Sequence, residues 1–174
     1  MTASDQNFLN NRVLIVTGAA SGFGRLVCEK AAALGARVLC ADVNESGLQE
    51  TLASIASNGG KAEAIVTDVR DLADTQAMAA KAIELWGEID ILVNNAGIMP
   101  LAFFADHAEA CESWTRCIDI NIKGVMHGII SVHDQMIAQG RGHIVNLSSI
   151  YSNHPVAGAA VYGASKAAVN FLSD

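Results

Sequence analysis

A serine, a tyrosine and a lysine near the end of the chain have the types and spacing needed for proton transfer at a carbon–oxygen bond. Tyr162 and Lys166 are four residues apart in a segment that predicts a helix start, so their side chains share one helix face. A free phenol holds its proton at neutral pH, but a neighbouring ammonium favours the phenolate, which can act as a general base. Ser149 follows an apolar run, and its hydroxyl can hold a substrate oxygen beside Tyr162. The three residues predict acid–base chemistry on an alcohol or carbonyl group.

Each of these residues also has an ordinary structural interpretation. Ser149 could cap a strand end, and Tyr162 could be a helix residue packed at the surface. Tyr151 shows how a tyrosine alone misleads, since no lysine follows it four residues later. The order and context of the three residues together favour the catalytic interpretation.

A glycine-rich segment, residues 17–24, lies between the first predicted strand and the first predicted helix and reads TGAASGFG. Glycine allows a sharp turn and a close approach to a ligand, because it has no Cβ. The free N–H groups and the dipole of the helix start attract an anion, and a pyrophosphate fits. A tight turn without a ligand is the alternative. The residues expected to contact the cofactor in this segment are Gly18, Ser21, Gly22, Phe23 and Gly24.

An aspartate ends the second predicted strand. The carboxylate of Asp42 can accept hydrogen bonds from the ribose hydroxyls of adenosine, and it would repel a 2′-phosphate. Val43 follows it, and the glycine turn contains no Arg or Lys that could bind that phosphate. We therefore expect NAD, with NADP the less favoured cofactor. The alternative is that Asp42 only caps the turn that comes next.

Strand and helix patterns alternate along the chain, and the strands are nearly continuous apolar runs. This alternation predicts an α/β fold with a doubly wound, Rossmann-like parallel sheet, and residues 1–174 as a single domain. The expected strands are 12–17, 37–41, 62–67, 89–93 and 143–147. The expected helices are 23–34, 44–57, 73–86, 109–139 and a last one beginning near Tyr162.

Composition excludes several classes of partner. The chain is 51% hydrophobic and has a net charge of −7, so a nucleic acid or an anionic membrane is a poor partner. No segment predicts a membrane span or a signal peptide, so we expect a cytoplasmic protein. The four cysteines form no CxxC pair and are interpreted as packing residues with reduced thiols. The five histidines lack metal-ligand spacing, and no metal site is expected.

Taken together, these motifs resemble those of the short-chain dehydrogenase/reductase family. Residues 17–24 are similar to its TGxxxGxG turn, and residues 94–97 match its NNAG motif. Residues 121–124 resemble its helix-borne asparagine motif, and Ser149, Tyr162 and Lys166 match its catalytic set. The resemblance covers the chain from residue 12 onward. It implies an oxidoreductase that transfers a hydride between NAD(H) and a secondary alcohol or ketone.

The resemblance also implies individual roles. Asn121 is expected to hold a water in a proton relay from Lys166, and Lys166 also to bind the nicotinamide ribose. Asp68 is expected to contact the adenine, whereas Asn95 ties the central sheet together. The remaining cofactor-site residues expected by resemblance are Val43, Val69, Asn94, Ala96, Gly97 and Tyr162.

Members of this family continue beyond the position of Asp174, so the resemblance implies that sequence is missing. The alternatives are a truncated protein that binds NAD weakly, or a non-enzymatic nucleotide-sensing or interaction protein on the same fold. Apolar residues in 99–104 and 150–156 are expected to border the pocket and favour a hydrophobic alcohol or ketone. By resemblance, the full-length protein is expected to form a homodimer or homotetramer through the helix at 109–139 and the last helix.

Overall fold

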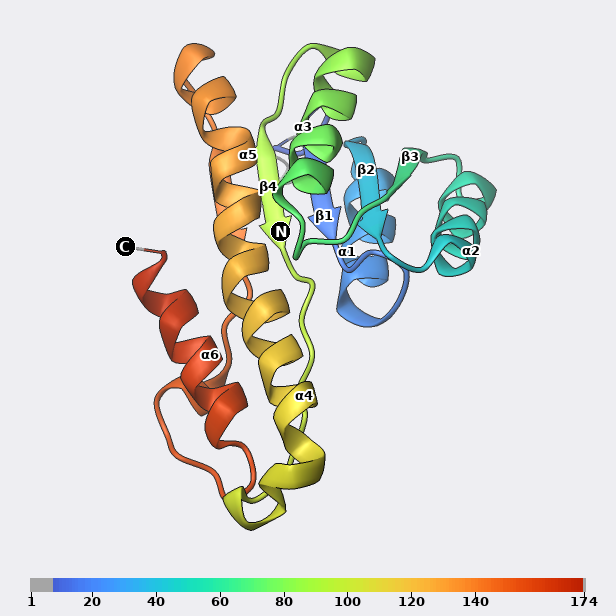
Figure 1. The fold of residues 1–174 in the computed structure, drawn as a ribbon. Coiled ribbons are helices and arrows are strands. Elements are labelled where there is room, and N and C mark those ends of the chain that lie inside the picture. The colour runs from blue at the N-terminus through green and yellow to red at the C-terminus, as the bar shows by residue number, and fades with distance from the viewer. Residues whose placement is uncertain (1–7, 174) are drawn as a thin grey trace.

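The computed structural model describes residues 8–173, which form a five-stranded parallel sheet with helices packed on both faces (Figure 1). The strand order is β3-β2-β1-β4-β5, and all neighbouring strands are parallel. The predicted doubly wound, Rossmann-like sheet is confirmed. The strands are β1 (Val13–Thr17), β2 (Arg37–Asp42), β3 (Lys61–Val66), β4 (Ile91–Asn94) and β5 (His143–Asn146).

Two of the helices begin at residues whose side chains cap them. The side chain of Asn44 accepts a hydrogen bond from the N–H of Gly47 at the start of α2, and that of Asp71 caps α3. None of the helices in residues 8–173 has the length and apolar character that a membrane span requires. The helices are α1 (Gly22–Ala33), α2 (Glu45–Ser57), α3 (Leu72–Trp86), α4 (His107–Ile118), α5 (Gly124–Ala138) and α6 (Ala160–Phe171).

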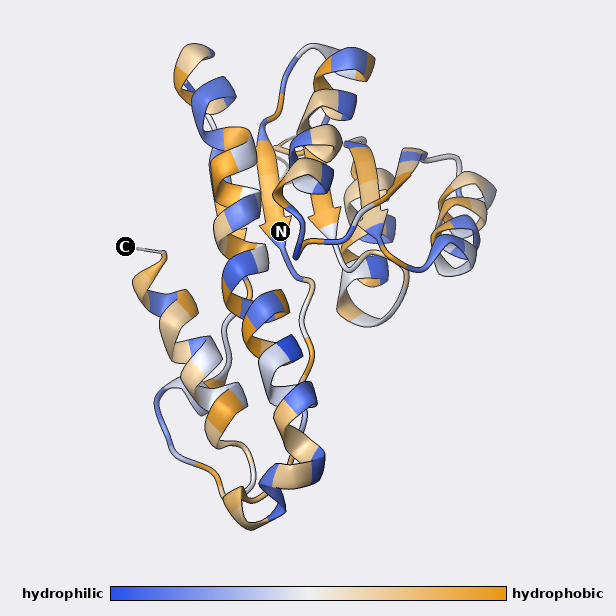
Figure 2. Ribbon diagram, in the orientation of Figure 1, coloured by the Kyte–Doolittle hydropathy of each residue, from blue (hydrophilic) through white to orange (hydrophobic). Residues whose placement is uncertain are grey.

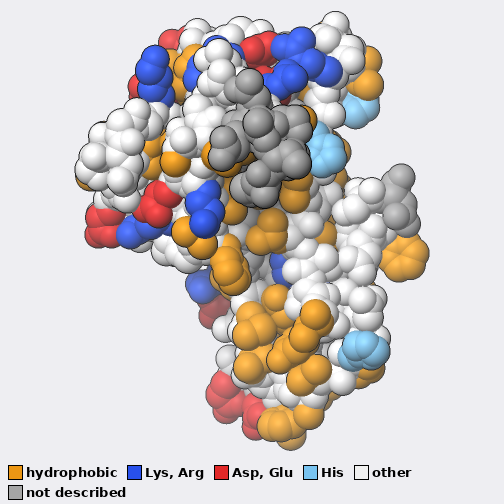
Figure 3. All heavy atoms as spheres, turned by 180° about the vertical axis from the view of Figure 1, so that it is seen from behind, with side chains coloured by type: hydrophobic (Ala, Val, Ile, Leu, Met, Phe, Trp, Pro, Cys, Tyr) orange, Lys and Arg blue, Asp and Glu red, His pale blue; other side chains and the backbone are white. Residues whose placement is uncertain are grey.

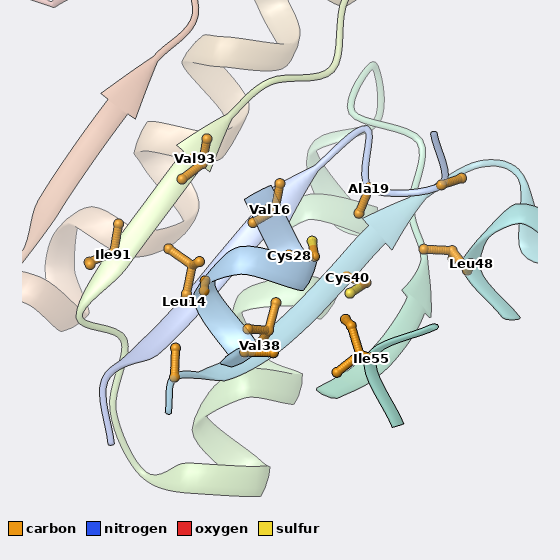
Figure 4. Packing of buried hydrophobic residues seen from close by; sticks show 14 residues of the cluster. Leu14, Val16, Ala19, Cys28, Val38, Cys40, Leu48, Ile55, Ile91 and Val93 are labelled. Atoms are coloured by element: carbon orange, nitrogen blue, oxygen red, sulfur yellow. The ribbon is translucent and has the colours of Figure 1, made fainter. Parts of the chain in front are cut away.

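Two hydrophobic clusters hold the helices to the two faces of the sheet. Successive residues of β1 point to opposite faces, so Leu14 and Val16 join the cluster under α1 and α2 (Figure 4). Val13 and Ile15 join the cluster under α3 and α5. All four side chains are buried, and burying a Val, Leu or Ile stabilises the fold by roughly 1.5–3 kcal/mol. The central strand is therefore firmly held and can position the glycine turn at its carboxyl end.

The strands are more apolar than the helices, which present mixed faces to the surface (Figure 2). The side chains become more exposed from the central strand toward the edge strands of the sheet. All five residues of β1 are buried, whereas β5 lies at an edge of the sheet and alternates between exposed and half-buried residues. In residues 8–173, no strand pairs with the outer side of β5.

The predicted long helix at 109–139 is interrupted. Between α4 and α5 lies a π-helical turn, η3 (Asp119–Lys123), in which the N–H of Gly124 reaches back to the carbonyl of Asp119. A π turn accommodates one extra residue without ending the helix. Two short 3-10 helices, η2 (Phe104–Asp106) and η4 (Ile150–Ser152), lie outside the strands and helices expected from the sequence.

Candidate active site

The carboxyl ends of the strands meet around a cavity of about 790 Å³. In an open parallel sheet, ligands bind in this crevice, where the loops after neighbouring strands diverge. Residues that come after each of the five strands line the cavity, together with the first turns of α6. The predicted site residues in its wall are Gly18, Ser21, Gly22, Phe23, Asp42, Val43, Asp68, Val69, Ala96, Gly97, Ser149, Tyr162 and Lys166.

The glycine turn needs its glycines for two different reasons. Gly18 and Gly22 have φ angles of 68° and 53°, a left-handed conformation that other residues adopt with strain. A Cβ on Gly24 would lie 2.0 Å from the carbonyl oxygen of Gly18, so α1 packs directly against the turn. Ser21 occupies the N-cap position of α1 with an extended backbone, and its side chain makes no capping hydrogen bond. The open N–H groups of the first helical turn therefore remain available to an anion. Gly24 itself lies behind this wall rather than in it, and its contact with the cofactor stays a prediction.

Asn95 connects the end of β4 to the glycine turn, as the sequence analysis expected of it. Its Nδ2 donates to the carbonyl of Thr17 at 2.8 Å and to that of Gly18 at 3.2 Å. The hydroxyl oxygen of Thr17 accepts in turn from the N–H groups of Asn95 and Ala96, both at 3.1 Å. These four contacts fix the turn relative to the central strands.

The carboxylate of Asp42 is held at the tip of β2. One oxygen accepts from the N–H of Ala20 at 3.0 Å and the other from the N–H of Asn44 at 2.9 Å. Val43, the next residue, is 63% exposed and leaves an apolar surface beside the carboxylate. The guanidinium of Arg25 is engaged elsewhere, since it donates to the carbonyl of Ala20 and pairs with Glu50. The cavity wall at this point therefore carries negative charge.

A second carboxylate faces the cavity after β3. Arg70 donates to both oxygens of Asp68, with its Nη2 at 2.5 Å from one of them. This side-chain hydrogen bonding holds the pKa of Asp68 below its ordinary value. Arg70 also lines the cavity, and the sequence analysis missed it. The Asp-x-Arg spacing at the end of a predicted strand could have identified the pair.

Lys166 is a buried cation aimed at the cavity. It is 5% exposed, and its Nζ donates to the carbonyl oxygen of Leu147 at 2.7 Å. Burial lowers the pKa of this ammonium below its ordinary value. The Nζ lies 5.9 Å from the centroid of the Tyr162 ring, so the predicted pair does share one face of α6. Gly97 lies next to this ammonium, since a Cβ added at Gly97 would be in ordinary van der Waals contact with the Nζ at 3.5 Å.

Ser149 reaches the same cavity from the loop after β5. It caps η4, and its Oγ accepts a hydrogen bond from the N–H of Tyr151 at 3.2 Å. That contact uses one lone pair and leaves the hydroxyl proton free for a ligand. Ser149, Tyr162 and Lys166 therefore line one cavity, as their spacing predicted.

Asn121 is fully buried beneath the cavity wall. Its Oδ1 accepts from the N–H of Ile98 at 2.9 Å, and its Nδ2 donates to the carbonyl of Ile98 at 3.0 Å. The same Nδ2 lies 2.9 Å from the Oγ of Ser165. The side chain thus anchors the segment that comes after the NNAG motif. Its role as the holder of a relay water stays a prediction.

Asn94 differs from the expectation that it lines the groove. It is 3% exposed, and its Nδ2 donates to the Oδ1 of Asn146 on β5 at 2.8 Å. Its Oδ1 is buried without a hydrogen-bond partner and packs against Gly128 of α5, where a Cβ would lie only 2.2 Å away. The strand directs this side chain toward the helix layer, because neighbouring residues of a strand point to opposite faces.

The segments 99–104 and 150–156 expose apolar side chains, but only Met99 among these residues lines the cavity. Exposed examples at 99–104 and 150–156 include Met99, Leu101 and Ile150, and Figure 3 shows hydrophobic side chains gathered over the lower lobe formed by α4, α6 and their loops. Within the described chain, no group of His, Cys, Asp and Glu could hold a metal ion. The lining residues that the sequence analysis did not assign to the cofactor or to catalysis are Thr67, Arg70, Asn95, Ile98, Met99, Arg116, Ile120, Leu147 and Ser148.

Comparison with solved structures identifies close structural neighbours. A short-chain dehydrogenase/reductase from Burkholderia phymatum in complex with NAD superposes with a TM-score of 0.89 at 34% identity, over 94% of this chain and 58% of that one. A metagenomic short-chain oxidoreductase in complex with NADP gives a TM-score of 0.87 at 34% identity, over 94% of this chain and 74% of that one. A nicotinamide cofactor is therefore supported.

The relatives found by sequence similarity are also named as oxidoreductases or dehydrogenases. An uncharacterised oxidoreductase of Listeria monocytogenes is 39% identical over 95% of this chain, which spans 66% of that relative's length. Galactitol 2-dehydrogenase of Agrobacterium fabrum is 41% identical over 92% of this chain and 61% of the relative. The profile of the family described as short chain dehydrogenase matches residues 12–174. The chain belongs to the short-chain dehydrogenase family.

Proposed function

We propose that this chain supplies the NAD-binding and catalytic part of an oxidoreductase that interconverts secondary alcohols and ketones. The observation that carries the proposal is the convergence of Ser149, Tyr162 and Lys166 on one cavity that also contains the glycine turn. A volume of about 790 Å³ suits an extended ligand such as a dinucleotide. Because the chain spans less than two thirds of the first relatives' length, the activity proposed is that of the whole protein.

The cavity wall has the donors and the shape that a dinucleotide needs. The pyrophosphate would lie on the open N–H groups at the start of α1, next to Ser21 and Phe23. The adenosine would lie against Asp42 and Val43, with Asp68 and Val69 on its other side. The nicotinamide ribose would lie between Lys166 and the segment that contains Ala96 and Gly97. The glycines support this proposal, since a Cβ at Gly18 would lie 2.8 Å from the Nδ2 of Asn95 and would displace the glycine turn.

The preference for NAD over NADP rests on the surroundings of Asp42. A 2′-phosphate at the adenosine ribose would meet this fixed carboxylate, and Val43 offers it no positive charge. Arg25 is engaged by the carbonyl of Ala20 and by Glu50. Structural neighbours carry NAD in one case and NADP in another, so the preference depends on these local contacts. Asp42→Ser is expected to narrow the difference in affinity between the two cofactors.

The chemistry depends on the three side chains. Bound NAD+ supplies the hydride acceptor. The Ser149 hydroxyl donates a hydrogen bond to the substrate oxygen and holds it beside Tyr162. Tyr162 removes the hydroxyl proton during alcohol oxidation and returns it during ketone reduction. The ammonium of Lys166 stabilises the phenolate that forms at Tyr162. Asn121 keeps the wall at Ile98 in place through its two hydrogen bonds.

The direct test is the formation of NADH from NAD+ and an alcohol. Xylitol, galactitol and cyclohexanol would be tried as probes, and Ser149→Ala would serve as a comparison that leaves the cofactor site intact. We expect turnover with at least one probe, faster with NAD+ than with NADP+, and a large loss of rate in Ser149→Ala. NAD+ binding without turnover of any alcohol or ketone would instead support a non-enzymatic nucleotide-binding protein.

We also propose that the whole protein is a cytoplasmic homodimer or homotetramer. Apolar side chains along α4 and α5 support an interface, since Ile118, Met126, Ile130 and Ile137 are each at least 40% exposed. The cysteines of the chain are free thiols, which suits a reducing compartment. Light scattering during size-exclusion chromatography would give the number of subunits, and a monomer at micromolar concentration would contradict the proposal.

A further inference from the structure

The short helix η4 lies directly against α6, the helix that carries Tyr162 and Lys166. The ring of Tyr151 on η4 meets the ring of Tyr162 edge to face, with centroids 6.0 Å apart and planes at 82°. Tyr162 lines the cavity, whereas Tyr151 does not. Tyr151 therefore supports the Tyr162 ring from outside the cavity, while the Nζ of Lys166 lies 5.9 Å from the centroid of that ring.

Two further contacts hold η4 to α6. A Cβ on Gly163 would lie 2.9 Å from the carbonyl oxygen of Tyr151, so the two backbones approach more closely than a side chain would allow. Farther along α6, the Nδ2 of Asn170 donates to the Oγ of Ser152 at 3.1 Å. The position of η4 relative to α6 is thus fixed at three places.

The same short helix also fixes Ser149. The Oγ of Ser149 accepts from the N–H of Tyr151, and the carbonyl of Ser149 accepts from the Oγ of Ser152 at 2.5 Å. The helix η4 therefore determines the location of Ser149, which caps it, and that of Tyr162, whose ring packs against the ring of Tyr151. The hydroxyl groups of Ser149 and Tyr162 must both reach one substrate oxygen, and the distance between them depends on η4.

We propose that Tyr151 is a positioning residue, whose ring keeps the Tyr162 hydroxyl within reach of a substrate oxygen held by Ser149. The proposal rests on the proposed function, in which Tyr162 exchanges a proton with that oxygen. Edge-to-face aromatic pairs have a preferred geometry, so the Tyr151 ring restricts the rotation of its neighbour. Its own hydroxyl has no part in this role. Small displacements matter, because a shift of about 1 Å in a catalytic group can cost about 100-fold in rate.

The kinetic test compares Tyr151→Leu with Tyr151→Phe, using NAD+ and whichever alcohol probe the wild-type protein turns over. Loss of the ring in Tyr151→Leu should lower kcat about 10- to 100-fold and leave the KM for NAD+ within about twofold. Tyr151→Phe keeps the ring and should retain kcat within about twofold. Wild-type kcat in Tyr151→Leu would overturn the proposal, as would an equal loss in Tyr151→Phe.

A second pair of variants acts on η4 from the other helix. Asn170→Ala removes the hydrogen bond to Ser152 and should lower kcat severalfold without changing the KM for NAD+. Asn153→Ala is the matched control, because Asn153 ends η4 and its side chain makes no hydrogen bond within residues 8–173. Equal kcat in the two variants would contradict a positioning role for η4.

A spectroscopic measurement tests the geometry without turnover. The chain contains only two tyrosines, so ring-labelled tyrosine gives two NMR signals, which Tyr162→Phe assigns. In Tyr151→Phe the Tyr162 signal should keep its wild-type position, whereas in Tyr151→Leu it should shift as ring packing is lost. An unchanged Tyr162 signal in folded Tyr151→Leu would overturn the inference. Absence of turnover in the wild-type protein would instead overturn the proposed function, and this measurement would still decide the role of Tyr151.

Discussion

The sheet is built differently where its strands begin and where they end. We call the first side the amino edge and the second side the carboxyl edge. At the amino ends of the strands, charged side chains close the sheet through a network of ion pairs that joins Arg12, Arg37, Glu88, Asp90 and Arg141. At the carboxyl ends, the loops separate around a cavity of about 790 Å³. One edge joins neighbouring strands, whereas the other presents groups to a ligand.

The amino-end network centres on a buried carboxylate. Asp90 is 5% exposed and accepts from Arg12 and Arg141 at 2.9 Å each and from the N–H of Val13 at 2.9 Å. Glu88 extends the network by pairing with both Arg141 and Arg37. Both carboxylates are paired with donors, so the network favours stability.

The carboxyl edge contains features that cost stability. Gly18 and Gly22 have positive φ angles, Lys166 is a buried cation, and the Oδ1 of Asn94 is buried without a hydrogen bond. Such features are typical of functional sites that a rigid scaffold holds in place. The comparison therefore predicts that substitutions at the carboxyl edge affect activity most, and those at the amino edge affect stability most.

Tyr162→Phe should give the largest effect. Removal of the phenol oxygen should lower kcat about 10²- to 10⁴-fold, the range of general acid–base catalysis. Because the side chain is only half buried, the unfolding midpoint and the affinity for NAD+ should stay unchanged. Steady-state kinetics give kcat, and thermal unfolding without and with NAD+ gives the unfolding midpoint and the affinity for NAD+. A variant that keeps more than about a tenth of the wild-type kcat would exclude Tyr162 as the acid–base group.

Gly24→Ala should affect both binding and stability at the carboxyl edge. The new Cβ would lie 2.0 Å from the backbone oxygen of Gly18, so the glycine turn must shift. We expect a loss of about 1–3 kcal/mol in the free energy of unfolding and weaker binding of NAD+. Gly59→Ala is the control: Gly59 also has a positive φ angle of 76°, its Cβ would meet nothing within 4 Å, and it lies in the turn between α2 and β3 away from the cavity, so only backbone strain of about 1–2 kcal/mol is expected. Unchanged NAD+ affinity in Gly24→Ala would show that the turn does not contact the cofactor.

Asp90→Ala should show the reverse pattern at the amino edge. It removes the acceptor of Arg12 and of the N–H of Val13, and it leaves Arg141 with Glu88 as its remaining carboxylate partner. We expect the free energy of unfolding to fall by about 2 kcal/mol, less than for a fully buried ion pair, because both arginines are partly exposed. Denaturant titration gives this value. The kcat and the affinity for NAD+ should stay at wild-type levels, and a loss of either would break the proposed division between the two edges.

Acid pH should give the smallest effect and should act on the same carboxylate. Burial would raise the pKa of Asp90, but hydrogen bonds from Val13, Arg141 and Arg12 outweigh it and hold the pKa below its ordinary value. The folded state therefore binds this proton less readily than the unfolded state, whose pKa is about 3.9. The contribution of Asp90 is present above pH ~4 and is lost as the pH falls through the folded pKa. Asp90→Asn should lose less stability than the wild type over that acid range, and equal losses would contradict this assignment.

Much of the fold and the catalytic set could be predicted from the sequence, because both depend on local patterns. Alternating apolar strands and helices predict the parallel sheet, and a spacing of four residues places Tyr162 beside Lys166. Contacts that depend on three-dimensional packing could not be predicted. The carbonyl of Leu147 that holds Lys166 has no sequence signal, since every residue has a carbonyl. The Arg12–Asp90 pair joins residues 78 positions apart.

The same limit explains two of the corrections near the site. Asn94 belongs to a motif that resembles a cofactor-binding one, but the register of β4 against β5 pairs its side chain with Asn146. The π turn at Asp119–Lys123 changes a helix pattern by a single residue, which apolar periodicity over a long helix does not reveal.

The most direct test of the central claim is thermal unfolding of the chain with NAD+ and, separately, with NADP+. A ligand at 100 times its dissociation constant stabilises the native state by about 2.7 kcal/mol. We predict a clear rise in the unfolding midpoint with NAD+, a smaller one with NADP+, and a narrower difference between them in Asp42→Ser. A cooperative transition whose midpoint neither cofactor changes would contradict a nicotinamide site at the carboxyl edge of this sheet.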